Sequence, residues 1–318
     1  MSTYDLAGKR IYVAGHRGMV GAAIIRRLER EAPAEIITMT RQELDLRDQR
    51  AVHDWMMAAK PDAIFMAAAK VGGIIANDSY PAEFLYDNLT LTNNIIHSAY
   101  QSGVEKLLCL GSSCVYPKLA PQPIKETALL EGALEPTNQW YAIAKIAGIK
   151  MCQAYRRQYG CDFISAMPTN LYGPGDNYHL ENSHVIPGLM RKAHEAKMNQ
   201  SPSMEIWGTG NIKREFMHVD DCADGLVFIM KNISQETHVN IGQGDDITIQ
   251  DLAKLIMERV GYNGALTHNF SRPDGTPQKL MDNTILAAMG WSPSYDLTSG
   301  LDHSYQWFLD HKDNIREA

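Results

Sequence analysis

Tyr141 and Lys145 are the residues whose types and spacing most directly suggest a reaction. They lie four positions apart in YAIAK, which places both side chains on one face of a helix. A free tyrosine has a pKa of about 10, so it is a poor acid or base near neutrality. A neighbouring ammonium stabilises the phenolate and lowers that pKa, which predicts proton transfer at a carbonyl oxygen. The alternative is an amphipathic helix with a half-buried tyrosine and a surface lysine.

Two hydroxyls and a thiol lie upstream in GSSCVYP, residues 111–117. The preceding KLLCL is typical of a buried strand, so these side chains fall where a strand gives way to a loop. We expect Ser112 to hydrogen-bond a carbonyl that accepts hydride, which completes a hydride-transfer site with Tyr141 and Lys145. Cys114 has two interpretations. It is either a buried apolar filler, as free cysteines usually are, or a thiol that exchanges a proton with a substrate.

A glycine-rich segment, GHRGMVG, follows the strand-like RIYVAG and opens a helix-like segment. Its glycines are Gly15, Gly18 and Gly21. Backbone N–H groups and a helix N-terminus can approach a diphosphate only where no Cβ atom intervenes. In this strand–loop–helix setting the triplet predicts dinucleotide binding, and the alternative is an ordinary turn with helix-packing glycines.

Charged residues near the ends of the first two strands bear on which dinucleotide is bound. Arg17 lies within the glycine loop and Arg41 follows EIITMT. Two guanidinium groups suit a 2′-phosphate, so we favour NADP(H). Glu43 and Asp45 lie nearby and could hold the ribose hydroxyls of NAD, so NAD is the second option. Asp45 could instead accept a hydrogen bond from the adenine amine. Either arginine could also be an ordinary solvated charge.

The segments that must position these residues alternate between strand and helix patterns. Strands are expected in RIYVAG, EIITMT, DAIFMAAA, EKLLCLGSS and CDFISAMPTN, and helices in the stretches between them. This order predicts an α/β fold with a Rossmann-like, doubly wound parallel sheet. We assign residues 1–172 to an NADP-binding Rossmann domain.

After Pro174 the composition changes, and Gly, Asn, His and Pro become dense. Helices are expected near 185–198, 220–231, 248–260 and 298–311, with short strands at MEIWG and HVNIG. These predict a smaller C-terminal α/β substrate-binding region over 173–318. Whether some of its segments return to the Rossmann sheet stays open.

Bulk properties exclude several classes of protein. The 318 residues carry a formal net charge of −7, which argues against a general nucleic-acid binder. No signal peptide is visible in MSTYDLAGKR, and no apolar run reaches the roughly 18 residues that span a bilayer. The five cysteines show no CxxC spacing, so neither a disulfide framework nor a metal site is expected. A reduced cytoplasm is the expected location.

Several longer strings resemble one enzyme family. The three glycines, Ser112, Tyr141 and Lys145 resemble the extended short-chain dehydrogenase/reductases, which act mainly on nucleotide sugars. The strings that carry the closest resemblance, to the members that epimerise and reduce GDP-4-keto-6-deoxy-D-mannose with NADPH, are AGHRGMVG, AAAKVGGI, GSSCVYPK, EPTN, YAIAKIAGIK, MPTNLYGPGDN, NSHVIPGL, REFMHVDD and PDGTPQKL. The match covers nearly the whole chain.

The resemblance implies roles for further residues. Cys114 would be the base and His184 the acid of C3 and C5 epimerisation. The residues implied to bind NADP(H) are Gly15, His16, Arg17, Gly18, Met19, Val20, Gly21, Arg41, Asp45, Leu110, Gly111, Ser113, Lys145, Pro168, Thr169, Asn170, Leu171 and His184. Those implied to bind the GDP-sugar are Lys192, Trp207, Arg214 and Asp274.

Two other functions stay open. One is a related GDP-sugar enzyme of the colitose-forming type, which inverts C5 only. The other is a non-catalytic dinucleotide sensor, against which the intact pair of Tyr141 and Lys145 argues. The resemblance also implies a homodimer, formed through the long helices over 82–103 and 138–159.

Overall fold

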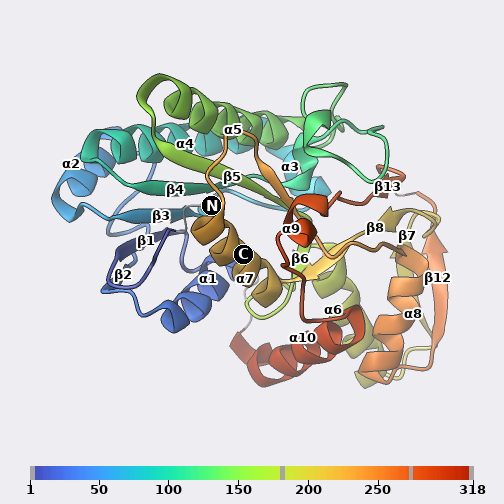
Figure 1. Ribbon diagram of the computed structural model, residues 1–318. Coiled ribbons are helices and arrows are strands. Elements are labelled where there is room, and N and C mark those ends of the chain that lie inside the picture. Colours follow the sequence, from blue (N-terminus) through green and yellow to red (C-terminus); the bar gives the residue numbers. More distant parts are fainter. Residues whose placement is uncertain (1–3, 180–182, 272–274, 315–318) are drawn as a thin grey trace.

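A six-stranded parallel sheet forms the centre of the computed structural model, which describes residues 4–179, 183–271 and 275–314 (Figure 1). All neighbouring strands run parallel. In spatial order the strands are β2 (Glu35–Ile37), β1 (Arg10–Ala14), β3 (Ala63–Met66), β4 (Lys106–Leu110), β5 (Asp162–Pro168) and β10 (Val239–Ile241).

Helices cover both faces of this sheet (Figure 1). Because side chains alternate along a strand, Tyr12 and Ala14 contribute to one core while Ile11 and Val13 contribute to the other. One face is covered by α2 (Gln49–Ala59), α4 (Pro81–Ser102) and α5 (Gln139–Tyr159), and the other by α1 (Met19–Leu28) and α7 (Val219–Asn232). The predicted α/β, Rossmann-like fold is confirmed.

The strand order places a switch point at β1. The chain runs from β1 to β2 on one side and then crosses to β3 on the other. Crossovers leave in opposite directions there, so a crevice opens at the carboxyl ends of β1 and β3, where such folds bind ligands. The glycine loop leaves β1 at this point.

A second group of elements has its own apolar core, built largely by three helices. They are α6 (Val185–Met198), α8 (Ile249–Val260) and α10 (Leu297–His311). Its strands are β7 (Ser203–Trp207) paired with β12 (Ala265–Asn269), and β8 (Lys213–Arg214) between β11 (Ile247–Thr248) and β13 (Gln278–Lys279). The remaining elements are α3 (Ile74–Ser79), α9 (Thr284–Ala288), β6 (Asn170–Tyr172) and β9 (Phe216–His218), with short 3-10 turns at Glu29–Glu31, Ser113–Val115, Glu126–Ala128 and Lys312–Asn314.

The two groups are interwoven along the chain. After β6 the chain builds part of the second group and then returns, because α7 packs beside α1 and β10 extends the central sheet next to β5. No helix of the described residues is long and apolar enough to cross a membrane.

Two strand predictions need correction. EIITMT was expected to be a strand throughout, but β2 ends at Ile37, and the chain turns where the Glu43 carboxylate accepts from the Thr40 amide at 2.7 Å. The expected strand CDFISAMPTN ends at Pro168, and Asn170 begins β6 in a different sheet, paired with β9. The two-residue strands β8, β11 and β13 are too short to show a period in the sequence.

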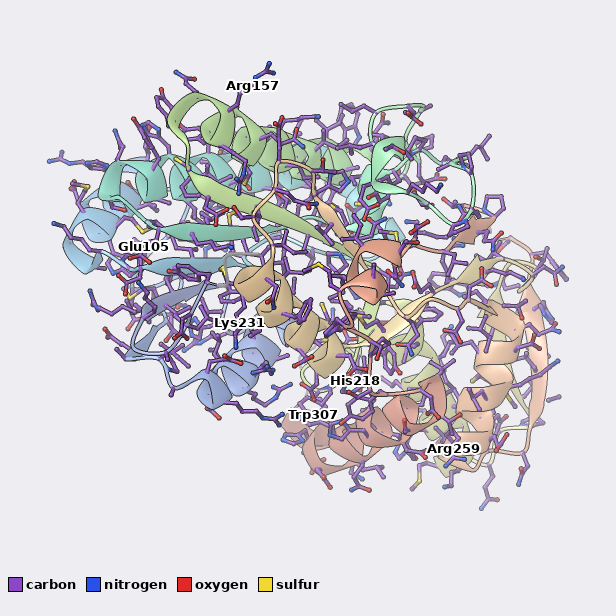
Figure 2. All side chains as sticks on the ribbon, viewed as in Figure 1. Glu105, Arg157, His218, Lys231, Arg259 and Trp307 are labelled. Carbon is purple, nitrogen blue, oxygen red and sulfur yellow. The ribbon has the colours of Figure 1, made fainter. Side chains whose placement is uncertain are left out.

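His218 shows how the two groups are joined (Figure 2). Its Nδ1 accepts from the Asp220 amide at 3.2 Å and so caps α7. The other ring nitrogen, Nε2, therefore carries the proton and lies 3.2 Å from Nδ1 of His303 on α10. Asp220, His218 and His303 are close enough to hold a metal ion, but hydrogen bonds already account for both nitrogens of the buried ring.

Candidate active site

The glycine loop lies where the crevice opens. Gly15 has φ +86°, and a Cβ there would come within 2.7 Å of the Ala68 backbone after β3. A Cβ on Gly21 would lie 2.2 Å from the Gly15 carbonyl oxygen. Gly18 begins α1 without a side-chain cap, and the first turn holds no acidic residue. Backbone and helix dipole are thus open to a diphosphate, so these residues fit a dinucleotide.

The residues expected near the ribose form a network of charges. Arg17 and Arg41 are exposed, and the Arg41 guanidinium lies 3.7 Å from the Asp45 carboxylate. Asp45 is paired more closely with Arg47, at 2.7 Å. Hydrogen bonds from Arg47 lower the pKa of Asp45 to about 2. Arg47, which no sequence pattern indicates, therefore binds the carboxylate that was expected to meet the adenine amine.

Lys145 and Tyr141 lie together on the inner face of α5. The Lys145 ammonium donates to the Leu110 carbonyl at 2.8 Å, which ties α5 to the end of β4, and lies 5.7 Å from the centre of the Tyr141 ring. Phe84 from α4 meets the same ring edge-on, with centroids 6.4 Å apart. The Tyr141–Lys145 pair therefore lies beside the end of β4, where Ser112 follows Leu110 by two residues.

The protonation of this pair differs from the expectation. Burial raises the pKa of Tyr141, and the negative charges that Cys114 and Cys109 can carry raise it further. Burial also lowers the pKa of Lys145, so the expected ammonium effect on the phenol does not dominate. Tyr141 is therefore protonated near neutrality, which is the state that a proton donor needs.

Cys114 lies in the single 3-10 turn that follows Ser112. The Ser112 hydroxyl accepts from the Cys114 amide at 3.4 Å, and the cysteine is only 8% exposed. Burial raises the pKa of the thiol, whereas the charge of Lys279, the Ser112 hydroxyl and the charge of Lys145 lower it. Burial outweighs these groups, so the pKa of Cys114 is raised overall, and the two lysines limit that rise. Cys114 shares a site with Tyr141 and Lys145.

Lys279 on β13 is a site residue that the sequence analysis missed. It lines a small cavity together with Cys114, Asn138 and Thr276. Burial lowers the pKa of this lysine, and the charge of Cys114 opposes that effect. Lys279 falls in PDGTPQKL, a string selected for Asp274 alone. Hydrogen bonds of the neighbouring Leu280 backbone with Gln122 and Ile124 hold this segment beside the loop that follows Cys114, and a two-residue strand gives no signal in sequence.

The other residues expected at the cofactor lie at the ends of β4 and β5. Leu110, Gly111 and Ser113 follow one another across the end of β4, and a Cβ on Gly111 would collide with the Met167 sulfur at 2.2 Å. At the end of β5, the side chains of Thr169 and Asn170 donate to the Glu215 carbonyl at 3.4 and 2.8 Å. Glu215 is fully buried and fixes this turn to the second group.

His184 comes from the second group, at the N-cap of α6. Its side chain is 50% exposed, and Nδ1 lies 3.8 Å from a carboxylate oxygen of Asp176. Burial lowers the pKa of His184, but the nearby Asp176 carboxylate outweighs it and raises the pKa overall.

Three of the four residues expected at the substrate lie in the described part of the chain. The Lys192 ammonium lies 5.1 Å from the centre of the Trp207 ring, so α6 and β7 bring these two side chains together. Arg214 on β8 is the register partner of Lys279 on β13. Arg214, which was expected at the nucleotide, therefore lies next to Lys279, which lines the cavity beside Cys114. Asp274 lies outside the described residues.

Comparisons with known proteins agree with this arrangement. Residues 11–242 match the model of the NAD dependent epimerase/dehydratase family. The chain is 55% identical to a GDP-L-fucose synthase of Sinorhizobium fredii, covering 98% of this chain and 99% of that protein. It is 51% identical to the GDP-L-fucose synthase of Escherichia coli, covering 98% and 100%.

More distant relatives give the same picture. Identity is 38% to a GDP-L-colitose synthase of Yersinia pseudotuberculosis, covering 96% of this chain and 99% of the relative. A GDP-L-fucose synthetase of Naegleria fowleri, solved bound to NADP, superposes with a TM-score of 0.89 at 27% identity, covering 99% and 98%. The glycine loop lies at the switch point of the sheet, and the tyrosine–lysine pair lies beside the end of β4. Together with these matches, this arrangement shows that the chain belongs to the NAD dependent epimerase/dehydratase family.

Proposed function

We propose that this protein converts GDP-4-keto-6-deoxy-D-mannose to GDP-L-fucose, by epimerising C3 and C5 and then reducing the C4 ketone with NADPH. The observation that carries the proposal is the thiol of Cys114 within the same buried site as Tyr141 and Lys145. A reductase needs only the tyrosine and lysine. A thiol whose charge is favoured by two lysines supplies the base that epimerisation requires in addition.

Epimerisation depends on the acidity that the C4 ketone confers on the C3 and C5 protons. The Cys114 thiolate removes a proton from one face of the sugar, and the resulting enolate carries its charge on the C4 oxygen. His184 then returns a proton to the opposite face, which inverts the carbon. The raised pKa of His184 suits this role, because an acid must hold its proton at the working pH.

Reduction uses the other half of the site. When bound, NADPH supplies the hydride that converts the C4 ketone to an alcohol. Tyr141 gives its proton to the C4 oxygen, Ser112 hydrogen-bonds that oxygen, and Lys145 favours the phenolate that Tyr141 leaves behind. The residues proposed to hold the cofactor are the glycine-loop residues 15–21, Arg41, Asp45, Leu110, Gly111, Ser113, Lys145, residues 168–171 and His184.

The GDP end of the substrate is proposed to lie on the second group. Lys192 and Arg214 offer positive charge to the diphosphate, and Trp207 offers a ring face for stacking. Asp274 is proposed to accept from the sugar or base. Residues 1–172 would then bind mainly the cofactor and residues 173–318 mainly the substrate.

The relatives favour the fucose-forming reaction over the colitose-forming one, because identity is 55% to the first kind and 38% to the second. The intact pair of Tyr141 and Lys145 disfavours a sensor without catalysis. All three possibilities are separated by one experiment.

That experiment incubates the protein with GDP-4-keto-6-deoxy-D-mannose and NADPH in heavy water and reads the product by NMR. We expect GDP-L-fucose that carries deuterium at both C3 and C5. A product inverted at C5 alone would indicate the colitose type of chemistry. Deuterium-free GDP-6-deoxy sugar would leave only a reductase, and no NADPH consumption would support the sensor.

We also propose a homodimer in a reducing, cytoplasmic setting. The outward sides of α4 and α5 expose Tyr86, Trp140 and Ile143, an apolar set that suits a helix-to-helix interface between two copies. All five cysteines are free, as expected for a reducing compartment. Sedimentation equilibrium of the wild type and of Trp140→Glu tests the interface, since the variant should shift toward monomer.

A further inference from the structure

Asp176 is a buried acid that has no part in the proposed reaction. It lies in the loop between β6 and α6, and its side chain is only 4% exposed. One carboxylate oxygen accepts from the Asn177 amide at 2.8 Å. The other, Oδ2, is buried without any hydrogen-bond partner among the described residues. A buried carboxylate oxygen with no donor is costly, so its retention calls for an explanation.

The nearest group that can carry a positive charge is His184. Its Nδ1 lies 3.8 Å from Oδ1 of Asp176, which is within ion-pair range but longer than a hydrogen bond. Because the His184 side chain is half exposed, a small rotation about its side-chain bonds can shorten this distance. The buried carboxylate of Asp176 and the exposed imidazole of His184 therefore lie within ion-pair range, and a small movement of the ring would bring them into hydrogen-bond contact.

The location of His184 makes such a partner necessary. The residue caps the N-terminus of α6, a helix of 14 residues, where the helix dipole disfavours a positive charge. Partial burial disfavours it as well. Among the described residues, Asp176 is the one titratable group whose charge acts on this imidazole. Arg191 on α6 donates to the Tyr178 carbonyl at 3.0 Å and to Glu195 at 2.8 Å.

We propose that Asp176 is the positioning residue of His184, binding the Nδ1–H group so that Nε2 faces the sugar and the ring stays protonated until it delivers its proton. This inference rests on the proposed function, in which His184 is the acid. The proton balance is simple. The Cys114 thiolate gains the proton of the sugar carbon, the His184 imidazolium gives up its Nε2 proton to the opposite face, and both groups return to their starting states by exchange with water.

The test compares Asp176→Asn with the wild type and with Asp54→Asn. The Asp176→Asn side chain keeps the size of aspartate and an oxygen for the Asn177 amide. Asp54→Asn removes the same charge from an exposed position on α2. The pKa of His184 is measured by NMR with histidine labelled at the ring carbons, and the signal is assigned with His184→Gln. We expect a lower pKa in Asp176→Asn and an unchanged pKa in Asp54→Asn.

A second measurement follows deuterium exchange at C3 and C5 against pH. The acid must be protonated, so exchange falls as pH rises through the pKa of His184, and that limb should move to lower pH in Asp176→Asn. Near neutrality the rate should fall roughly tenfold, short of the loss of about 10²–10⁴-fold that removing a general acid causes. Asp176→Glu, which keeps the charge, should recover part of the rate.

The outcomes separate this inference from the proposed function. An unchanged His184 pKa in Asp176→Asn overturns the positioning role, even if the protein makes GDP-L-fucose. An equal exchange loss in Asp176→Asn and Asp176→Glu, without a pH shift, also overturns it, because it indicates a merely structural role. The NMR titration needs no substrate, so it stands even if the wild type proves inactive on GDP-4-keto-6-deoxy-D-mannose.

Discussion

The site has two unlike sides. On the central-sheet side, Tyr141, Lys145 and Cys114 are held by α5, by a hydrogen bond to the end of β4 and by a capped turn. On the side of the second group, His184 is 50% exposed and Trp207 is 37% exposed. Tyr141, Lys145 and Cys114 are buried or half-buried, whereas His184 and the ring proposed to meet the nucleotide are more exposed.

This contrast separates two tasks. Burial raises the pKa of both Tyr141 and Cys114, so the central-sheet side controls when protons move. The second group has its own core. In the proposed function it supplies the charges and the ring face that hold the GDP end. Substitutions of the groups proposed to move protons, with His184 and Lys279 from the second group among them, should therefore change rate. Substitutions of Trp207, Lys192 and Arg214 should change affinity.

The largest effect is expected from Tyr141→Phe. Removing the phenol hydroxyl removes the proton donor, so NADPH oxidation should fall by about 10²–10⁴-fold. Deuterium exchange at C3 and C5 should persist, because it does not use this proton. Tyr159→Phe, at the exposed end of the same helix, serves as the control. Wild-type NADPH oxidation by Tyr141→Phe would contradict the assigned role.

Cys114→Ser should lose exchange by about 10²-fold or more, since a serine hydroxyl is far less acidic than a thiol and supplies almost no anion to remove the proton. Reduction of an already epimerised ketone should survive, which NADPH oxidation measures. Cys161→Ser is the matched control, because Cys161 lies at the far end of α5. If Cys114→Ser exchanged sugar protons at the wild-type rate, the thiol would have no part in epimerisation.

Lys279→Met tests the cation that the second group places beside the thiol. Without that charge the pKa of Cys114 should rise further, so the limb on which exchange increases with pH should move to higher pH. At neutral pH the exchange rate should fall roughly tenfold. Lys279→Arg should retain the wild-type profile. The position of the limb would stay fixed if Lys279 acted only in packing.

The smallest effect is expected from Trp207→Ala. Loss of a stacking face should raise KM for the GDP-sugar roughly tenfold or less and leave kcat nearly unchanged. Steady-state kinetics measure both, and Met198→Ala, an exposed position at the end of α6, is the control. A fall in kcat with constant KM would contradict a role for Trp207 in binding the GDP end alone.

The sequence predicted the features that depend on local pattern. The alternation of strands and helices identifies the sheet, and the glycines of GHRGMVG are readable because backbone approach requires glycine at Gly15 and Gly21. Lys279, Asp176 and Arg47 were not selected, because each acts on a partner that only the tertiary fold brings near. The direction of the Tyr141 pKa was wrong for the same reason, since burial is not visible in YAIAK.

The return of the chain to β10 and α7 has a consequence for any attempt to divide this protein. A fragment that stops at residue 172 would leave residues 166–168 of β5 without the pairing of β10 and would remove α7 from the apolar side of α1. Open strand edges and bare apolar faces promote aggregation. A fragment of residues 1–172 is therefore unsuited to studies of cofactor binding. Fusion partners and split reporters should be attached at the ends of the chain.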